Sequence, residues 1–233
     1  MTNYRDLLSG TLLFNELPDA HMDAIMAIAV EKTINAGELI FSDGDPGNGF
    51  YITADGLIKI YKVSAEGKEQ ILHLFGPGEP FGEVPVFSGH AFPANAEAIK
   101  KSKLLFFPRD TFVNLVTKNP FLALNMLAIL SRRLRHFTVQ VENLSLKEVP
   151  ARLAGYFILL AEEQENPEVV QLKISKGHLA SFLGTIPETL SRMLKKMSDQ
   201  GLIGVEGRKI RLLDYDGLVD LADSGKLGIA DII

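Results

Sequence analysis

The sequence TIPETLSRMLKKMSDQGLI, residues 185–203, places an unusual set of side chains at one end of a predicted helix. Pro, Glu, Thr, Ser and Arg fall in its first two turns, and Lys195 and Lys196 follow directly behind them. A helix that only packs against its own domain does not need this set. We therefore expect this end of the helix to contact a partner.

Short structural signals surround this helix on both sides. Ser175 can cap a preceding helix, Gly184 ends that helix, and Gly201 stops the second one. The next segment, IGVEGRKIRL at 203–212, predicts a β-hairpin. A helix, a short glycine-containing turn, a second helix and a β-wing together predict a winged helix-turn-helix.

In such a motif the N-terminal part of the second helix enters the DNA major groove, where each base pair shows a distinct donor and acceptor pattern. Glu188 can accept from a cytosine amino group, and Arg192, one turn later, can donate to guanine O6 and N7. Ser191 or Thr189 can reach a base edge or a phosphate, and lysines further back are expected on phosphate. We predict eight DNA-binding residues: Glu188, Thr189, Ser191, Arg192, Lys195, Lys196, Arg208 and Lys209.

A local alternative competes for Glu188. Thr185-x-x-Glu188 also fits a capping box, in which the glutamate bonds to backbone N–H instead of a base. The surrounding helix-turn-helix and wing favour base contact.

The basic residues are concentrated in the segment that contains the predicted helix-turn-helix. The chain has a formal net charge of −5, but residues 171–211 contain eight basic and three acidic residues, which leaves −10 elsewhere. A basic module on an acidic body is expected of a protein that touches phosphate with one end only. The alternative is a basic face that is merely solvated.

The N-terminal part predicts a β-structure. After a short helix at 18–30, short apolar runs alternate with Gly, Asp, Asn and Pro up to residue 108. Many short strands with close turn signals are typical of a sandwich or barrel, and we predict an antiparallel β-roll at 33–108.

A long helix is predicted next, because residues 120–146 contain no Gly and no Pro after the first position. Apolar residues at alternating spacings of 3 and 4 form a heptad seam typical of a parallel coiled-coil dimer: Leu127, Leu130, Leu134, Phe137, Val141 and Leu144. The alternative is that this stripe packs on the chain's own β-roll. Pro150 predicts a hinge at 147–150.

Together these patterns predict an α+β chain of three parts. They are a β-roll sensing domain at 1–119, a dimerisation helix at 120–146 and a winged helix-turn-helix at 147–233. The absence of cysteine excludes disulfides and thiolate-held metals. No signal peptide or apolar run of about 20 residues is present, so we expect a cytoplasmic protein without a membrane partner. The five histidines are scattered, which argues against a metal-dependent β-roll enzyme, and no enzyme activity is expected.

This order of parts resembles the Crp/Fnr family of bacterial transcription regulators over nearly the whole chain. GELIFSDGDPGNGFYITADGLIKIYK, with Gly37, Gly44 and Gly56, is similar to the family's roll signature, and FGEVPVFSG to the start of its effector-binding cassette. Glu188, Ser191 and Arg192 fall on the family's E-x-x-S-R pattern. The resemblance implies a homodimer on double-stranded DNA, on an inverted repeat with TGA-type half-sites. It also implies contact with RNA polymerase if the protein activates.

The resemblance also implies an effector pocket in the roll, formed by Gly82, Glu83, Val84, Pro93 and Ala94. Cyclic-nucleotide members carry an Arg-Ser pair eleven and twelve residues after the cassette glycine, where this chain has Pro93 and Ala94. Because a buried phosphate without a cation is costly, cyclic AMP is not expected.

The absence of cysteine likewise excludes the iron–sulfur oxygen sensor. The chain is similar to a cysteine-free branch of the family that responds to nitrosative stress. This branch includes the dissimilative nitrate respiration regulator and the hybrid-cluster-protein regulator. The resemblance implies haem b as a cofactor and nitric oxide as the signal. His21 and His90 are the preferred ligands, followed by His73, His136, Met22 and Met26. The alternative is another anion or a small apolar ligand.

Overall fold

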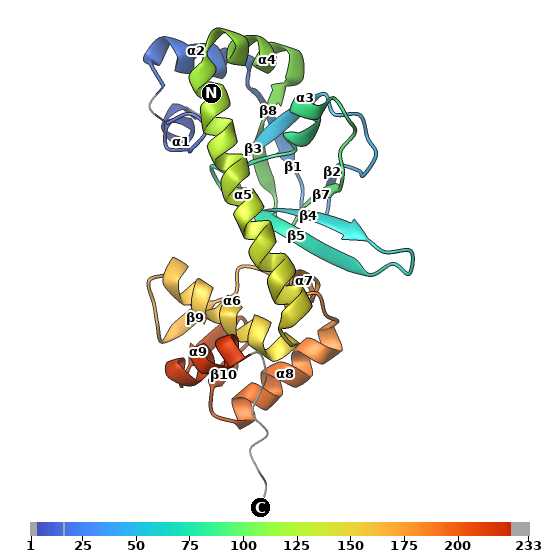
Figure 1. Cartoon of the computed structure of the whole chain (residues 1–233), viewed down its shortest axis with the longest axis vertical. Helices are drawn as coiled ribbons and strands as arrows, with labels where there is room; N and C mark the ends of the chain where they lie inside the picture. Colours follow the sequence, from blue (N-terminus) through green and yellow to red (C-terminus); the bar gives the residue numbers. More distant parts are fainter. Residues whose placement is uncertain (1–3, 16, 225–233) are drawn as a thin grey trace, which may run out of the picture. The chain divides into compact units, whose positions relative to one another are not determined.

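The computed structural model describes residues 4–15 and 17–224. The chain divides into two compact units, Met1–Arg135 and His136–Ile233, and the boundary lies inside a long helix (Figure 1). The strands of the first unit and the helix-turn-helix of the second confirm the predicted α+β class. The division into three parts at 1–119, 120–146 and 147–233 stays a prediction.

The first unit contains two four-stranded antiparallel sheets. One has the order β1-β8-β3-β6, with bounds Val30–Ile34, Ser102–Pro108, Gly49–Asp55 and Pro80–Phe81. The other has the order β2-β7-β4-β5, with bounds Leu39–Phe41, Asn95–Ala98, Ile58–Val63 and Glu69–Phe75. The predicted β-roll is therefore confirmed, and its first strand starts at Val30.

Alternation along β3 builds two hydrophobic cores, because successive side chains point to opposite faces of a strand. Tyr51 packs in the core shared by the two sheets, with Phe41, Phe75 and Phe81. Phe50 and Ile52 pack in the other core, which residues of the helices complete.

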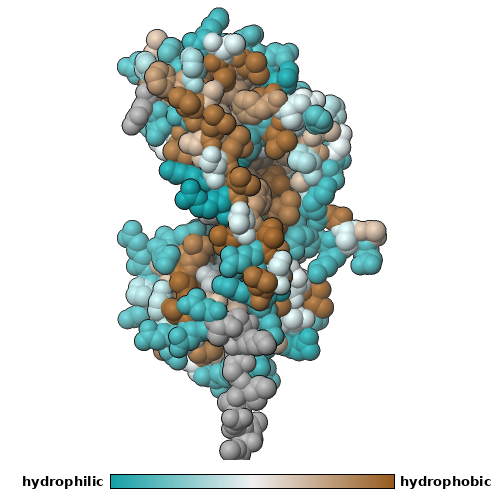
Figure 2. Space-filling model, viewed as in Figure 1, coloured by the Kyte–Doolittle hydropathy of each residue, from teal (hydrophilic) through white to brown (hydrophobic). Residues whose placement is uncertain are grey.

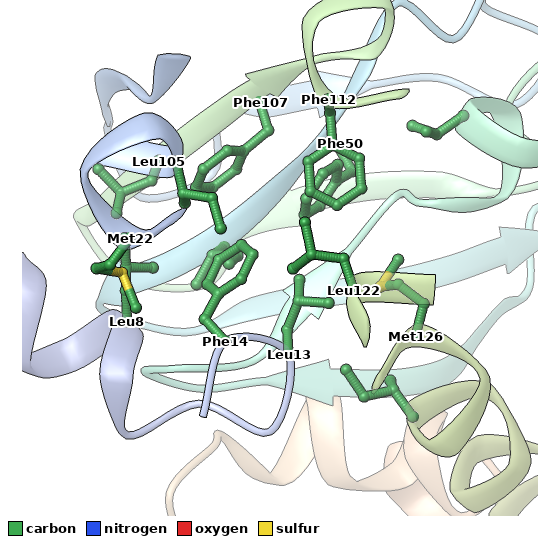
Figure 3. Packing of buried hydrophobic residues seen from close by; sticks show 14 residues of the cluster. Leu8, Leu13, Phe14, Met22, Phe50, Leu105, Phe107, Phe112, Leu122 and Met126 are labelled. Carbon is green, nitrogen blue, oxygen red and sulfur yellow. The ribbon is translucent and has the colours of Figure 1, made fainter. Parts of the chain in front are cut away.

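Five helices belong to this unit: α1 (Arg5–Ser9), α2 (Asp19–Ile28), α3 (Val84–Ser88), α4 (Arg109–Lys118) and the start of α5 (Pro120–Leu146). In the second core, the ring centroid of Phe50 lies 5.0 Å from that of Phe107 and 4.6 Å from that of Phe112. Figure 3 shows Leu122 and Met126 of α5 reaching into the same cluster. This packing attaches the first half of α5 to the roll.

The helix α5 has two apolar faces in its first half. Leu122, Met126 and Ile129 are at most 7% exposed and pack on the roll. The predicted seam lies on another face, and all its members are 36–69% exposed: Leu127, Leu130, Leu134, Phe137, Val141 and Leu144. Within the first unit, Leu127, Leu130 and Leu134 of the seam therefore do not pack on the roll, contrary to the alternative. Hydrophobic residues are visible along this part of the chain in Figure 2.

The second unit is a winged helix-turn-helix with a three-stranded sheet of order β10-β11-β9. Its elements are α6 (Val149–Glu163), β9 (Val169–Gln171), α7 (Lys176–Phe182), α8 (Pro187–Asp199), β10 (Ile203–Glu206), β11 (Lys209–Leu212) and α9 (Tyr215–Ser224). As predicted, the Ser175 hydroxyl caps α7 by accepting from the backbone N–H of His178 at 3.1 Å. Gly184 and Gly201 end their helices with φ of +69° and +74°, conformations that favour glycine.

The start of α6 refines the predicted hinge at 147–150, and the burial of α9 places the apolar segment that follows the wing. α5 ends at Leu146 and α6 begins at Val149, so Pro150 lies in the first turn of α6 and not between the helices. Leu218 and Leu221 of α9 are buried, so the apolar GLVDLA segment packs within the second unit. Residues 225–233 lie outside the described residues.

In the part of the chain that the structure describes, no single helix has the length and apolar composition of a membrane span. Only α4 and α5 taken together have the required length and apolar composition, and the chain bends by 113° between them.

Candidate DNA-binding surface and effector pocket

The helix α8 separates a packed face from a polar face. Leu190, Leu194 and Met197 are buried, and they hold the helix on the domain. On the other side, the predicted base-reading residues Glu188, Ser191 and Arg192 are exposed together with Lys195 and Lys196, whereas Thr189 is half-buried. The polar side chains do not take part in the core, so they are available to a partner.

Two details at the start of α8 bear on the predicted roles. The Arg192 guanidinium donates to the Thr189 hydroxyl at 3.2 Å, so Thr189 positions the arginine. The N-cap residue is Ile186, with no side-chain cap, and Glu188 makes no hydrogen bond through its carboxylate within residues 4–15 and 17–224. The capping-box alternative is therefore wrong, and the Glu188 carboxylate is free to accept from a partner.

The turn before α8 is held by a residue that the sequence analysis did not identify. Arg152 of α6 donates a hydrogen bond to the carbonyl of Leu183, at the end of α7. Burial lowers the pKa of this guanidinium, which is the expected effect of desolvating a cation. Arg152 thus links α6 to the helix-turn-helix, and its sequence context PARL gives no periodic signal for this role.

Most of the eight basic residues at 171–211 have no acidic partner among the described residues. Lys173 pairs with Glu163 and Arg211 pairs with Glu206, each at 2.6 Å. The other six form no ion pair within the described chain: Lys176, Arg192, Lys195, Lys196, Arg208 and Lys209. Unpaired cations are what a surface that binds phosphate requires.

A groove of about 260 Å³ lies between the start of α7, the exposed side of α8 and β10. Lys176 and Lys195 line it with Ser191 and Ser198, and Asp199 lies at the same groove. Two ammonium groups and two hydroxyls suit a phosphate of the DNA backbone. We therefore add Lys176, the first residue of α7, to the predicted set; the sequence pattern alone did not indicate this role.

The predicted effector pocket contains an internal cation. Glu83, only 5% exposed, forms an ion pair with Arg133 of α5. Arg133 also donates to the carbonyl of Pro80, and its guanidinium lies 4.9 Å from the ring centroid of Phe75. Arg133 therefore lies on the roll-facing side of α5, which the heptad pattern of the seam does not indicate.

The other predicted pocket residues lie in different environments. Gly82 has φ of +72°, and a Cβ there would lie 3.1 Å from Phe41 and 3.2 Å from Phe92. Phe41 and Phe92 stack with a centroid distance of 3.8 Å. Ala94 is buried, but Val84 and Pro93 are exposed. The structure therefore groups Gly82 and Glu83 near packed aromatic rings, and it does not bring all five residues into one lining.

The predicted haem ligands lie on separate elements. His21 Nδ1 is 2.8 Å from the Asn119 amide, and His90 Nδ1 is 2.9 Å from the carbonyl of Ser88; both histidines are exposed. Met22 is buried in the core, Met26 is half-buried against it, and His73 packs on the Phe75 ring. The His136 side chain lies outside the described residues. Within the described chain, no three His, Cys, Asp or Glu side chains cluster as a metal site.

Comparisons with known proteins agree with both units. A family model described as a cyclic nucleotide-binding domain matches residues 31–119, and one described as a Crp-like helix-turn-helix domain matches 151–221. The cyclic AMP receptor protein of Thermus thermophilus is 30% identical over 212 residues, covering 89% of this chain and 97% of that protein.

Two further relatives extend the comparison. The fumarate and nitrate reduction regulatory protein of Escherichia coli is 30% identical over 196 residues, covering 82% of this chain and 78% of that protein. The structure of FixK2 from Bradyrhizobium japonicum covers 87% of this chain and 100% of that one, with a TM-score of 0.73. At 24% identity this last likeness shows the fold alone.

The buried ion pair gives a testable prediction about stability. Arg133→Met should lower the free energy of unfolding by about 3–5 kcal/mol, because it leaves the Glu83 carboxylate buried without a partner. The double variant Glu83→Gln, Arg133→Met should recover most of this loss. Urea unfolding at fixed protein concentration measures both.

Arg132→Met is the matched control, because Arg132 is the exposed neighbour on the same helix. It should change stability by less than about 0.5 kcal/mol. A single Arg133 variant as stable as this control would show that the pair contributes nothing.

Proposed function

Because the chain belongs to the Crp/Fnr family of DNA-binding transcription regulators, we propose that it acts as a homodimer on an inverted repeat with TGA-type half-sites. The observation that carries this proposal is the free polar face of α8, where Glu188, Ser191 and Arg192 are exposed together. They present an acceptor, a hydroxyl and a guanidinium fork, which are the groups that read base edges.

A homodimer is supported by the exposed seam of α5. A row of six leucine, phenylalanine and valine side chains, each at least 36% exposed, is an apolar face that a second copy would cover. Two-fold symmetry then places the two recognition helices about 34 Å apart, one turn of DNA. Regulation of transcription would include contact with RNA polymerase if the protein activates.

For the effector we propose a ligand other than cyclic AMP. Pro93 offers no cation, and the Glu83 carboxylate is already paired with Arg133. Our first candidate is haem b as a nitric oxide sensor of the nitrosative-stress branch. Support comes from the exposed imidazoles of His21 and His90, whose Nδ1 atoms are held by hydrogen bonds. The aromatic stack of Phe41 and Phe92 fits haem less well, because the rings occupy the space beside the cassette. The second candidate is another anion or a small apolar ligand.

Base reading predicts a specific effect of Arg192→Ala. Binding to a palindrome with TGA half-sites should weaken by about 1–3 kcal/mol per half-site, and discrimination against altered half-sites should fall. Lys176→Ala is the contrasting variant, since it should weaken binding to all duplexes alike and reduce the salt dependence by about one phosphate. Fluorescence anisotropy measures the affinity of each variant for the palindrome and for a duplex with altered half-sites. An Arg192 variant that binds the palindrome as wild type does would refute base reading.

The seam predicts that Phe137→Glu separates the dimer, because it places two like charges in an apolar interface. Val139→Glu is the matched control, because Val139 is also exposed, at 49%, but lies off the seam. Sedimentation velocity should show monomers for the first variant and dimers for the second. An unchanged dimer for Phe137→Glu would remove the seam as the interface.

Haem binding is tested by titrating the purified protein with haem and recording the absorption spectrum before and after nitric oxide. The proposal predicts a Soret band that saturates at one haem per chain and shifts with the gas. His21→Ala or His90→Ala should abolish the band if that residue is the ligand. Weak binding beyond one haem per chain would reject haem and leave the second candidate, without affecting the DNA-binding assignment.

A further inference from the structure

The tip of the recognition helix carries an exposed aliphatic side chain. Ile186 is 48% exposed, although it lies directly beside the exposed base-reading face of α8. Pro187 follows it as the first residue of the helix, is also exposed, and has no backbone N–H. Two successive residues at the entering end of the helix can therefore neither donate nor accept through their side chains.

Folding does not explain isoleucine at this position. Ile186 is the N-cap residue of α8, where Ser, Asn, Asp and Thr are preferred because their oxygens accept from the first free N–H groups of the helix. The side chain of Ile186 makes no such bond and does not belong to the buried core of the unit. The absence of a cap costs stability here, and a contact outside the fold would account for isoleucine at this position.

The position of Ile186 defines what it can reach. It precedes Glu188 by two residues and Arg192 by six, a span of about 9 Å along the helix axis. Stacked base pairs are about 3.4 Å apart, so this span covers two to three base pairs. If α8 follows the groove, Ile186 would lie over the same TGA-type element or the base pair beside it.

The major groove offers one apolar feature for an aliphatic side chain, the 5-methyl group of thymine. Because isoleucine is β-branched and stiff at χ1, it presents its methyl groups in a defined direction. Given the proposed base-reading role of α8, on which this inference rests, we propose that Ile186 is a specificity-determining residue. It packs on a thymine methyl within or directly beside the TGA-type element.

The test replaces thymine by deoxyuridine, which lacks only the 5-methyl group and keeps the base pairing. In a palindromic operator, each symmetrical pair of thymines is changed in turn and the affinity of the full-length protein is measured. One pair should weaken wild-type binding by about fourfold per half-site, the value expected for one apolar carbon removed from contact. The other thymine pairs should have smaller effects.

Two variants of Ile186 complete a double-mutant cycle. Ile186→Val keeps a β-branched apolar side chain and should retain the sensitivity to that methyl. Ile186→Ser removes the apolar group and should bind the thymine and deoxyuridine duplexes equally. Since serine is a good N-cap, Ile186→Ser should keep a melting temperature at or above that of wild type, so misfolding cannot account for its loss of discrimination.

Each outcome either supports or rejects the proposed role of Ile186. Equal sensitivity to deoxyuridine in wild type and Ile186→Ser, or no sensitive thymine in wild type, would overturn the role of Ile186. In either case, loss of binding to a duplex with scrambled TGA elements would leave the proposed function intact. Binding that ignores this scrambling would overturn sequence-specific reading itself, and the role of Ile186 with it.

Discussion

The buried ion pair between Glu83 and Arg133 sets the orientation of the longest helix in the chain. Arg133 continues the roll-facing row of Leu122, Met126 and Ile129, whose spacings of 4 and 3 it extends by a further 4 residues. A guanidinium is tolerated at this position because the carboxylate, the carbonyl of Pro80 and the Phe75 ring all contact it. With this face fixed on the roll, the seam that begins at Leu127 must face away from it.

The same pair limits what the roll can bind. A ligand that binds to the Glu83 carboxylate must either displace Arg133 or bind beside a carboxylate whose charge Arg133 already neutralises. Such a replacement would lose the buried pair, so the ligand would have to bind strongly enough to offset that cost. The pair also connects the cassette to the helix that carries the seam. An effector that broke this pair would be coupled to the proposed dimer interface through Arg133.

Local signals in the sequence were sufficient to predict the winged helix-turn-helix. Contacts between residues distant in the sequence could not be predicted in this way. Ser175, Gly184 and Gly201 act within a few residues of themselves, and each is found as predicted. Lys59 shows the opposite case. Lys59 is 4% exposed and pairs with Glu69 and Glu97 from two neighbouring strands, and no local signal in LIKIYK indicates this burial. The pairing of Arg133 could not be predicted either, since its partner Glu83 lies 50 residues away in the sequence.

The two faces of α8 explain why its function was visible in the sequence but its exact specificity was not. Leu190, Leu194 and Met197 hold the helix, and none of the base-reading side chains contributes to that packing. The exposed residues are consequently free of folding constraints, and their choice is set by the partner alone. Thr189 is the exception because it holds Arg192 in place, and it couples the reading of one base to the geometry of the helix itself. At Ile186 a hydroxyl residue would stabilise the helix by about 1 kcal/mol, so the proposed thymine contact would be made at a cost in stability.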